Sequence, residues 1–506
     1  MPKIAAWLGQ HPASMWLVGG AVRDALAGRV LHDIDVVVAG DALAVARDFA
    51  QAIGGAVGVL DATGGIVRVV PPNASLHFDF ATMQGASIEE DVRVRDFTIN
   101  ALALPLTTAS LAALLDGTLH LPLADGAWGL LDPCGGLADL AARRLRMVSA
   151  MALANDPVRI LRAARLATTL DLTSDAATSD AACLVAPRLA TMPPERLLAE
   201  IYAMMAQPHS TQAMHLLDAM GALTVLVPPL IPCRGMTQGR LHYWDVFDHT
   251  LAVIDSLDRV VALLEAGLRQ PAVLGEPDAD GRVPHPDALD LGGQNAVVLA
   301  RLHTPLAEGQ TRLTMLKVAA IFHDVGKPVT RGVRDNGDIH FQGHAEAGVP
   351  LTSPVLRAWR MGRTARRFVE TAVACHMRPG QIAGPQGLSD KAARHFFRDA
   401  GDVGIDVAVF SLADHLAVYG PNPLTRFWLS HYPAVVELVR RVYMEPERVI
   451  PARLLDGNDL IARYGLAHGP EIGRILALVD AAHLDGTVAT RKEALAFVAR
   501  YLKQTP

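Results

Sequence analysis

Two aspartates stand one residue apart at the start of an apolar run, where Asp33 and Asp35 open the stretch DIDVVV. The β-branched residues predict a strand, and residues two apart on a strand project from the same face. Two carboxylates so close together repel each other, and aspartate is rare in strands. A divalent cation removes this repulsion. The aspartate pair therefore indicates a strand that forms part of a metal-binding site.

The residues before this pair fit a phosphate-binding site. Gly19 and Gly20 let the backbone approach a ligand closely, and the following AVRDAL predicts a helix start whose free N–H groups suit a phosphate. Arg23 adds a forked cation for a triphosphate. A third carboxylate, Asp79, lies in the strand-like run LHFDFAT. An aspartate pair alone would equally fit edge-strand charges or a turn, but this context favours a metal and nucleotide site.

The order GG-x-V-R-D, then D-x-D, then an apolar strand resembles the head motif of the nucleotidyltransferase superfamily. Within it, the stretch looks like class II tRNA nucleotidyltransferases (CCA-adding enzymes) and bacterial poly(A) polymerases. Later motifs of that family are similar to SIEEDVRVRDFTINALAL, LLDPCGGLADLAARRLR, NDPVRILRAARLA and PPERLLAEI. The resemblance covers essentially the whole chain. It implies in-line attack of a tRNA 3′-hydroxyl on the α-phosphate of CTP or ATP, with release of pyrophosphate.

The resemblance also implies roles for individual residues. Asp33 and Asp35 would hold two Mg²⁺ ions, and Asp79 would help to activate the attacking hydroxyl. Asp156 and Arg159 would form a template for the incoming base, although Asp156 also fits a helix cap ahead of Pro157. The arginine ladder that starts at Arg159 also fits a solvated helix face. The complete implied nucleotide-binding set is Gly19, Gly20, Arg23, Arg95, Asp96, Asn100, Asp156, Arg159, Arg162 and Arg165.

Three departures from the family pattern bear on which nucleotide is added. Only seven residues separate Asp79 from Ser87. Members of the family that add the complete CCA sequence have a longer loop there, so the short connection resembles the CC-adding subgroup. Gln84 stands where an arginine is common, and Asn155 where a glutamate is common before the template aspartate. Addition of CC only, A only or CCA therefore stays open.

A second chemical pattern lies in the histidines of the C-terminal half. An adjacent His-Asp pair, a histidine far upstream and an aspartate far downstream resemble the ligand order of HD phosphohydrolase domains. Such ligands suit a divalent transition metal or Mg²⁺, and a metal ion there activates water for phosphoester hydrolysis. The implied ligands are His249, His323, Asp324, His344, His376 and Asp414, with Lys327 on a phosphate. Three other histidines fit packed core positions: His242, His395 and His483.

The chain of 506 residues is long enough for three or four domains. We predict an α+β fold whose head, over 1–150, is a polymerase β-like nucleotidyltransferase domain with a mixed sheet. An all-helical neck for the base template and RNA binding follows over 151–235. An HD domain then occupies 236–420, with a mobile insertion at about 268–298, and a helical tail over 421–506 contacts tRNA. In that tail, the spacing of Thr490 and Glu493 predicts a capping box ahead of a helix.

Composition excludes several other classes of protein. No apolar run reaches the ~18 residues that a membrane-spanning helix needs, and the N-terminus lacks an apolar signal-peptide region. We therefore expect a cytoplasmic protein without membrane contact. The four cysteines are scattered, which argues against a disulfide framework or a zinc ribbon. The net charge of −6 means that any RNA site must be a local basic patch.

The prediction is thus an enzyme, a tRNA nucleotidyltransferase whose partners are tRNA, CTP and ATP and whose head uses Mg²⁺. A poly(A) polymerase that uses ATP alone shares the head motifs and is the alternative with the same chemistry. An alternative of another class is an HD phosphodiesterase or phosphatase whose head only binds RNA. The intact set of Asp33, Asp35, Asp79 and Arg95 favours a catalytic head.

Overall fold

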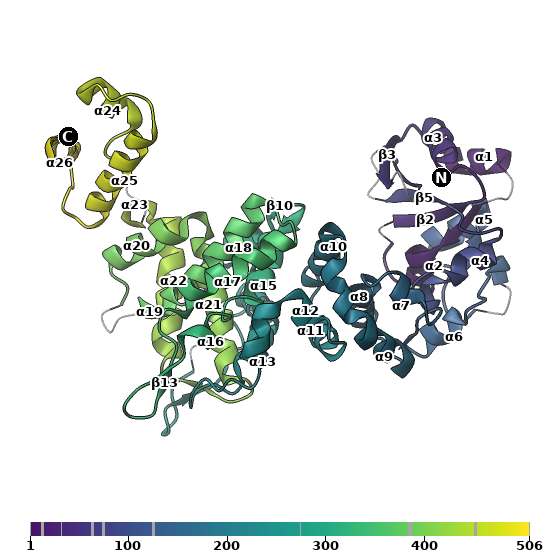
Figure 1. The fold of residues 1–506 in the computed structure, drawn as a ribbon, viewed down its shortest axis with the longest axis horizontal. Coiled ribbons are helices and arrows are strands. Elements are labelled where there is room, and N and C mark those ends of the chain that lie inside the picture. Colours follow the sequence, from purple (N-terminus) through teal and green to yellow (C-terminus); the bar gives the residue numbers. More distant parts are fainter. Residues whose placement is uncertain are drawn as a thin grey trace. The chain divides into compact units, whose positions relative to one another are not determined.

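The computed structural model describes residues 2–11, 15–31, 33–61, 65–72, 76–123, 127–273, 275–382, 387–449 and 453–504. The chain divides into two compact units (Figure 1). The first comprises residues 1–201 and 212–226, and the second comprises residues 202–211 and 227–506.

A six-stranded mixed sheet opens the first unit, with the strand order β3–β4–β5–β2–β1–β6. The two central strands, β2 and β5, run parallel, and their other neighbours are antiparallel. The strands are β1 (Met15–Val18), β2 (Asp33–Val38), β3 (Ala56–Asp61), β4 (Ile66–Val70), β5 (His77–Thr82) and β6 (Ala103–Pro105). This sheet confirms the predicted α+β class with a mixed-sheet head.

One face of the sheet is covered by the helix α3 (Ala42–Ile53). Phe78 and Phe80 of β5 point to this face, and the ring of Phe49 on α3 lies 5.0 and 5.3 Å from theirs, between centroids. Ile34 of β2 is fully buried. Burial of these apolar side chains fixes which way the two central strands face, since a slip by one residue would expose all of them.

The opposite face carries the carboxylates. Asp33, Asp35 and Asp79 alternate with the buried residues of β2 and β5 and therefore point away from α3. The parallel register sets Asp33 beside His77 and Asp35 beside Asp79. The sheet thus brings two segments more than forty residues apart in the sequence onto one polar surface.

Helices and short 3₁₀ turns complete the first unit. Ser87 caps α4, and its side chain accepts a hydrogen bond from the Glu90 N–H. Residues of α10 and α11 belong to both units. The elements are α1 (Pro2–Gln10), α2 (Gly19–Leu26), α4 (Ile88–Arg93), η1 (Thr98–Asn100), α5 (Thr108–Leu115), η2 (Ala127–Gly129), α6 (Gly136–Ala141), β7 (Arg144–Leu145), α7 (Ala152–Asn155), α8 (Arg159–Leu170), β8 (Thr173–Ser174), α9 (Ala176–Val185), η3 (Ala186–Thr191), α10 (Pro194–Met205), α11 (Ser210–Ala219) and α12 (Leu223–Leu226).

The second unit is helical apart from strand pairs of two or three residues. Its centre is built from α13, α15, α17, α18 and α21, which pack against one another. These and the neighbouring elements are η4 (Pro228–Cys233), α13 (Val246–Gly267), β9 (Arg282–Val283), α14 (Asn295–His303), β10 (Pro305–Ala307), β11 (Gln310–Thr311), α15 (Arg312–Ala320), α16 (Lys327–Thr330), β12 (Gly332–Val333), β13 (Ile339–His340), α17 (His344–Ala358), α18 (Arg363–Cys375), α19 (Arg378–Gln381), α20 (Asp390–Ala400), η5 (Gly401–Val403), α21 (Gly404–Tyr419), β14 (Leu424–Thr425), α22 (Trp428–Met444) and α23 (Pro446–Val449).

The last three helices, α24 (Gly457–Tyr464), α25 (Pro470–Leu484) and α26 (Arg491–Gln504), bury a small apolar cluster of their own. Among the described residues, no helix is both long enough and apolar enough to cross a membrane.

The segment expected to be a mobile insertion, at about 268–298, has two different parts. Most described residues from 268 to 282 are exposed. From there on the segment is anchored, because Val283 pairs with Leu424 in the β9–β14 ladder and the side chains of Leu289 and Leu291 are fully buried. The Pro- and Gly-rich composition therefore marks irregular backbone here, much of it held by packing.

Candidate functional site

A cleft of about 610 Å³ opens over the carboxylate face of the sheet in the first unit. Nine of the residues implied by the sequence motifs line it: Gly19, Gly20, Asp35, Asp79, Arg95, Asp96, Asn100, Arg159 and Arg162. The other lining residues, which were not singled out as site residues, include these four: Leu60, Ile66, Asp91 and Arg196. Two of these four had a signal in the sequence, because Asp91 and Arg196 lie inside quoted motifs.

Asp35 is the most perturbed carboxylate of the cleft. Burial and the nearby charges of Asp33 and Asp79 raise its pKa from 3.8 to about 6, against the opposing effects of Arg95 and the Gly20 N–H. A Cβ on Gly19 would stand 3.1 Å from Asp35 Oδ2, and Gly19 has a φ of +66°. Glycine is therefore required there for α2 to begin directly over this carboxylate.

Arg95 supplies positive charge on the same side of the cleft. Its Nε and Nη2 both donate to Asp91 Oδ2, at 3.1 and 2.9 Å. Its Nη1 would lie 3.3 Å from a Cβ on Gly19. The guanidinium thus lies over the glycine pair, where a triphosphate would be bound by the backbone.

Arg23 lies beneath the glycine pair and is not among the residues that line the cleft. Its Nη1 donates to Asn100 Oδ1 at 2.6 Å, and its Nε and Nη2 donate to Asp24 at 2.9 and 2.8 Å. Asn100 in turn donates to Asp96 Oδ1 at 3.0 Å, and Arg162 donates to Asp96 Oδ2 at 3.1 Å. In this structure the guanidinium of Arg23 therefore holds Asn100, a residue that lines the cleft.

The implied base template is assembled by three side chains. Asp156 Oδ2 lies 2.6 Å from Arg196 Nη2 and 3.7 Å from Arg159 Nε. Arg159 Nη1 also donates to the carbonyl of Arg95 at 2.9 Å. Arg159 and Arg196 line the cleft, whereas Asp156 lies behind them and accepts a hydrogen bond from the Val158 N–H at 3.3 Å, as a cap would.

The arginine ladder of α8 divides into two kinds of position. Arg162 lines the cleft and Arg165 is not among the lining residues. Both bind the buried carboxylate of Glu200, with Nε–Oε distances of 3.0 and 2.8 Å. Burial alone would raise the pKa of Asp96, but Arg162 and hydrogen bonds from Asn100 and the Phe97 N–H lower it below its usual range. Arg162 and Arg165 are therefore part of a network of ion pairs with Asp96 and Glu200.

The outer end of β2 and β5 offers donors for a divalent ion. Asp33, His77 and Asp79 each present one ligand atom, and these three atoms lie within 4.8 Å of one another. Asp79 is held by Arg68 of β4, whose Nε and Nη2 donate to its two oxygens at 2.7 and 2.6 Å. Sequence reasoning did not single out His77 or Arg68, which face the site only because of the strand register.

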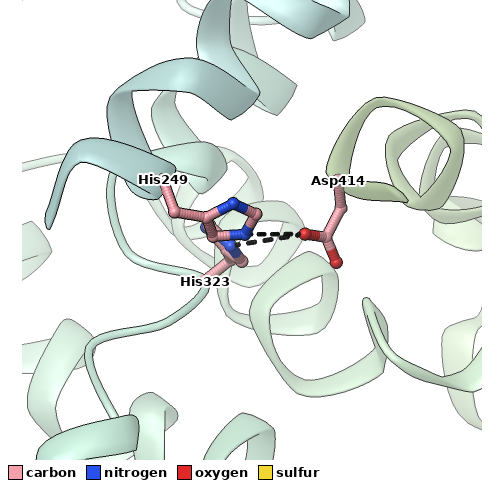
Figure 2. Close-up of side chains that lie close together, drawn as sticks. All are labelled: His249, His323 and Asp414. Atoms are coloured by element: carbon pink, nitrogen blue, oxygen red, sulfur yellow. Dashed lines mark hydrogen bonds and ion pairs between the residues drawn. The ribbon is translucent and has the colours of Figure 1, made fainter. Parts of the chain in front are cut away.

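The second implied site is built within the second unit from five segments. His249 comes from α13, Asp414 from α21, and the other ligands lie at or next to the ends of α15, α17 and α18. Their ligand atoms form two groups, each within 4.8 Å: His249, His323 and Asp414, and Asp324, His344 and His376. Figure 2 shows the first group, with both imidazoles directed at the carboxylate of Asp414.

Backbone carbonyls orient three of these imidazoles. Nδ1 of His323, His344 and His376 lies 2.9, 2.7 and 2.8 Å from a carbonyl oxygen three residues earlier. A hydrogen on each Nδ1 is thereby bound, which leaves Nε2 as the atom of each ring that can bind a metal ion. Nε2 of His344 and Nε2 of His376 are 3.1 Å apart. Two lone pairs at this distance repel each other unless a proton or a metal ion lies between them, so the arrangement fits a metal site.

The two carboxylates complete the ligand set. Asp324 lies 2.5 Å from Lys327 Nζ and 3.2 Å from His323 Nε2, and Asp414 lies 3.0 Å from His249 Nε2. Despite burial, the neighbouring cations and hydrogen bonds lower the pKa of both carboxylates. Burial lowers the pKa of His376 to about 3. Ionised carboxylates and a neutral imidazole are the forms that bind divalent ions.

A cleft of about 790 Å³ opens beside this cluster, and His344, His376 and Asp414 reach its wall. Its cationic lining consists of Lys327, Arg334 and Arg378. His242 also lines it, which makes the expectation of a packed core position wrong for this residue. His395 and His483 are partly exposed as well, so the same expectation is wrong for them. A histidine in a helical block has no sequence signal that separates a core position from a cleft wall.

Comparison with known proteins gives the family of the chain. A family model described as the poly A polymerase head domain matches residues 15–146, and one described as an HD domain matches residues 294–419. A third, described as a probable RNA and SrmB-binding site of polymerase A, matches residues 171–233. The matches fall on the sheet of the first unit, on helices that follow it, and on five of the six implied metal ligands of the second unit, all but His249.

Relatives match along the whole length. An A-adding tRNA nucleotidyltransferase of Deinococcus radiodurans is 32% identical over 503 residues, which span 98% of this chain and 97% of that protein. A CC-adding tRNA nucleotidyltransferase of Geobacter sulfurreducens is 30% identical over 519 residues, with 100% and 96% covered. A solved CCA-adding enzyme in an apo form shares the fold, with a TM-score of 0.56 at 17% identity over 98% of this chain and 92% of that one. This chain belongs to the family of tRNA nucleotidyltransferases and poly(A) polymerases.

Proposed function

We propose that this chain adds nucleotides from CTP or ATP to the 3′ end of tRNA at the cleft of its first unit. The observation that carries the proposal is the placement of Asp33, Asp35 and Asp79 on one sheet face, with the glycine pair at the start of α2 next to Asp35. Three carboxylates on one surface fit a divalent metal site for phosphoryl transfer, and free backbone N–H groups beside them fit a triphosphate.

The residues of the cleft have separable tasks. Asp33, Asp35 and Asp79 would hold divalent ions, which neutralise charge on the triphosphate and align it with the hydroxyl when they are bound. The N–H groups in the first turn of α2 and the guanidinium of Arg95 would bind the phosphates, whereas the Gly20 N–H donates to Asp35 in this structure. Because the chemistry needs little covalent help from the protein, positioning and charge neutralisation account for most of the catalysis.

The base is selected at the far wall of the cleft. Arg159 and Arg196 offer donors there, and Asp156 fixes both of them through its carboxylate. An arginine–aspartate pair can present donor and acceptor edges that suit C or A. The tRNA would be held through its backbone and shape by the arginine-bearing helices and the tail.

The five residues between β5 and α4, 83–87, favour addition of CC without the terminal A. A single-turnover assay with Mg²⁺ tests this, using tRNA transcripts that end at the discriminator base, at C and at CC, each with CTP, ATP or both. We expect extension to CC and no addition of A to the CC transcript. Addition of A there would show an A-adding or CCA-adding enzyme, and long poly(A) tracts on an unrelated RNA would favour a poly(A) polymerase.

We propose phosphoester hydrolysis as a second activity, at the metal-ligand cluster of the second unit. The facing Nε2 lone pairs of His344 and His376 support it, together with the cationic cleft beside them. A divalent ion there would activate water for hydrolysis when bound, and Lys327 would bind the phosphate. Metal analysis of the purified chain and hydrolysis of bis(p-nitrophenyl) phosphate test the proposal. Asp324→Asn should abolish both metal retention and hydrolysis.

A further inference from the structure

The outer end of the carboxylate face contains a nitrogen donor that the reaction scheme does not use. His77 is the first residue of β5 and pairs in parallel register with Asp33. It is two residues from Asp79 and so shares the face of that carboxylate. One ligand atom from each of Asp33, His77 and Asp79 lies within 4.8 Å of the other two, which is close enough for one ion to contact all three.

One ring nitrogen of His77 is without a partner in the part of the chain that the structure describes. Its Nε2 is buried and has no hydrogen-bond partner there. Buried polar groups nearly always have a partner, and an absent ion is one of the accepted reasons for an exception. This observation concerns an imidazole, so it is independent of the clustering of the aspartates.

Arg68 fixes the third ligand in place. Its two hydrogen bonds reach both oxygens of Asp79 from the β4 side, at 2.7 and 2.6 Å. Each carboxylate oxygen keeps a second lone pair, so the contact orients Asp79 without preventing it from binding an ion. The ion would then have one nitrogen and two oxygen ligands from the protein, with its other positions left for water and the triphosphate.

We propose that His77 is a metal ligand of the head site, together with Asp33 and Asp79, and that this mixed donor set shifts the site from Mg²⁺ towards a first-row transition ion. Mg²⁺ takes oxygen ligands almost exclusively, whereas imidazole favours transition ions. The inference deepens the proposed nucleotidyl transfer, on which its functional consequence rests. The binding of the ion by His77 is testable without that activity.

The test uses Mn²⁺ as the probe and the full chain with Asp324→Asn and Asp414→Asn, which remove the carboxylates of the second metal site. Mn²⁺ affinity is measured by electron paramagnetic resonance, and pulsed measurements detect coupling to an imidazole ¹⁴N. His77→Phe keeps a ring of similar shape and removes the donor. We expect at least a tenfold loss of Mn²⁺ affinity and loss of the nitrogen coupling that comes from the head. His120→Phe, at an exposed histidine of the same unit, should change neither.

A second variant covers the case in which His77→Phe does not fold. His77→Asp replaces the nitrogen by an oxygen donor, so the head should still bind an ion but its preference for Mn²⁺ over Mg²⁺ should fall at least tenfold, in binding and in single-turnover transfer. The inference would be overturned if folded His77→Phe kept the wild-type Mn²⁺ affinity and folded His77→Asp kept the wild-type preference for Mn²⁺ over Mg²⁺. This holds even if nucleotide transfer is intact. If the wild-type chain transfers no nucleotide with either ion, the proposed function fails, and the resonance data still decide the role of His77.

Discussion

A carboxylate in the head is held at an electrostatic cost that a bound cation would relieve. Asp35 is the clearest case, because burial and two neighbouring aspartates raise its pKa to about 6. Its closest counter-charge is Arg95, which is itself bound to Asp91. The residue thus destabilises the metal-free protein at neutral pH, as functional groups often do.

Replacing Asp35 by Asn should therefore stabilise the metal-free chain. Since the folded pKa lies above the unfolded value, the stabilising contribution of this carboxyl is complete below about pH 4 and is lost as the pH rises through 6. At pH 7.5 the loss is about 3 kcal/mol. We expect Asp35→Asn to unfold at higher urea concentration than wild type in EDTA at pH 7.5, with no such gain at pH 4.

The exposed Asp180 on α9 provides the control, because Asp180→Asn should leave the unfolding midpoint unchanged at both pH values. Nucleotidyl transfer by Asp35→Asn should be abolished. An Asp35→Asn chain that is less stable than wild type at pH 7.5 in EDTA would contradict the assigned pKa.

Arg68 is predicted to position Asp79 without contacting the nucleotide. Arg68→Leu should lower kcat by about 10- to 100-fold, the range for residues that orient metal ligands, and leave the KM for CTP nearly unchanged. Arg68→Lys should recover little, because lysine cannot bind both oxygens in one plane. Steady-state kinetics give the two parameters, with Arg47→Leu at an exposed arginine as the control. An equal rise in KM would assign Arg68 to substrate binding instead.

At the scale of elements, α8 shows how one helix serves both the site and the fold. Its arginines occur every three residues and follow one side of the helix. The first two line the cleft, and the third is bound to Glu200 outside it. The sequence pattern shows the ladder but does not distinguish these positions.

Arg162→Ala and Arg165→Ala should separate these tasks. Arg162→Ala removes a cation from the cleft and leaves the buried carboxylate of Asp96 without its guanidinium partner. We therefore expect weaker CTP binding and a loss of stability of about 3 kcal/mol or more. Arg165→Ala should cost stability alone, since Glu200 keeps Arg162. Isothermal titration with CTP and urea unfolding measure the two effects. Equal losses of CTP affinity in both variants would show that Arg165 also reaches the nucleotide.

At the scale of the whole molecule, the two candidate metal sites belong to different compact units. Asp33, His77 and Asp79 lie in the first, and all six ligands of the histidine cluster lie in the second. Each site has its own cleft, lined by residues of one unit only. Such sites are expected to respond independently to substitution.

This independence predicts a clean separation of activities. Asp33→Ala with Asp35→Ala should abolish nucleotide transfer and leave phosphoester hydrolysis at the wild-type rate, because the second site keeps all of its ligands. Asp324→Asn should have the opposite effect. Both reactions are assayed on the same preparations, with circular dichroism as the check on folding. Transfer that continues in the double alanine variant would refute the assignment of the head site.

The sequence by itself determined the features that depend on short-range chemistry. Alternation along DIDVVV placed Asp33 and Asp35 on one face of a strand, and the spacing of Thr490 and Glu493 correctly predicted a capping box at the start of α26. The head motif and the His-Asp pair indicated the family, which the full-length relatives confirm. Such patterns are readable because each depends on residues a few positions apart or on a family resemblance.

Only the tertiary structure decided the contacts between distant segments. The pairing of Arg68 with Asp79, the position of His77 beside Asp33 and the turn of Arg23 towards Asn100 all follow from strand register and helix packing. His242 belongs to the same class, since its place in a cleft wall depends on elements far away in the chain. No local pattern encodes these neighbours, because the burial of many apolar side chains together sets the register that brings them into contact.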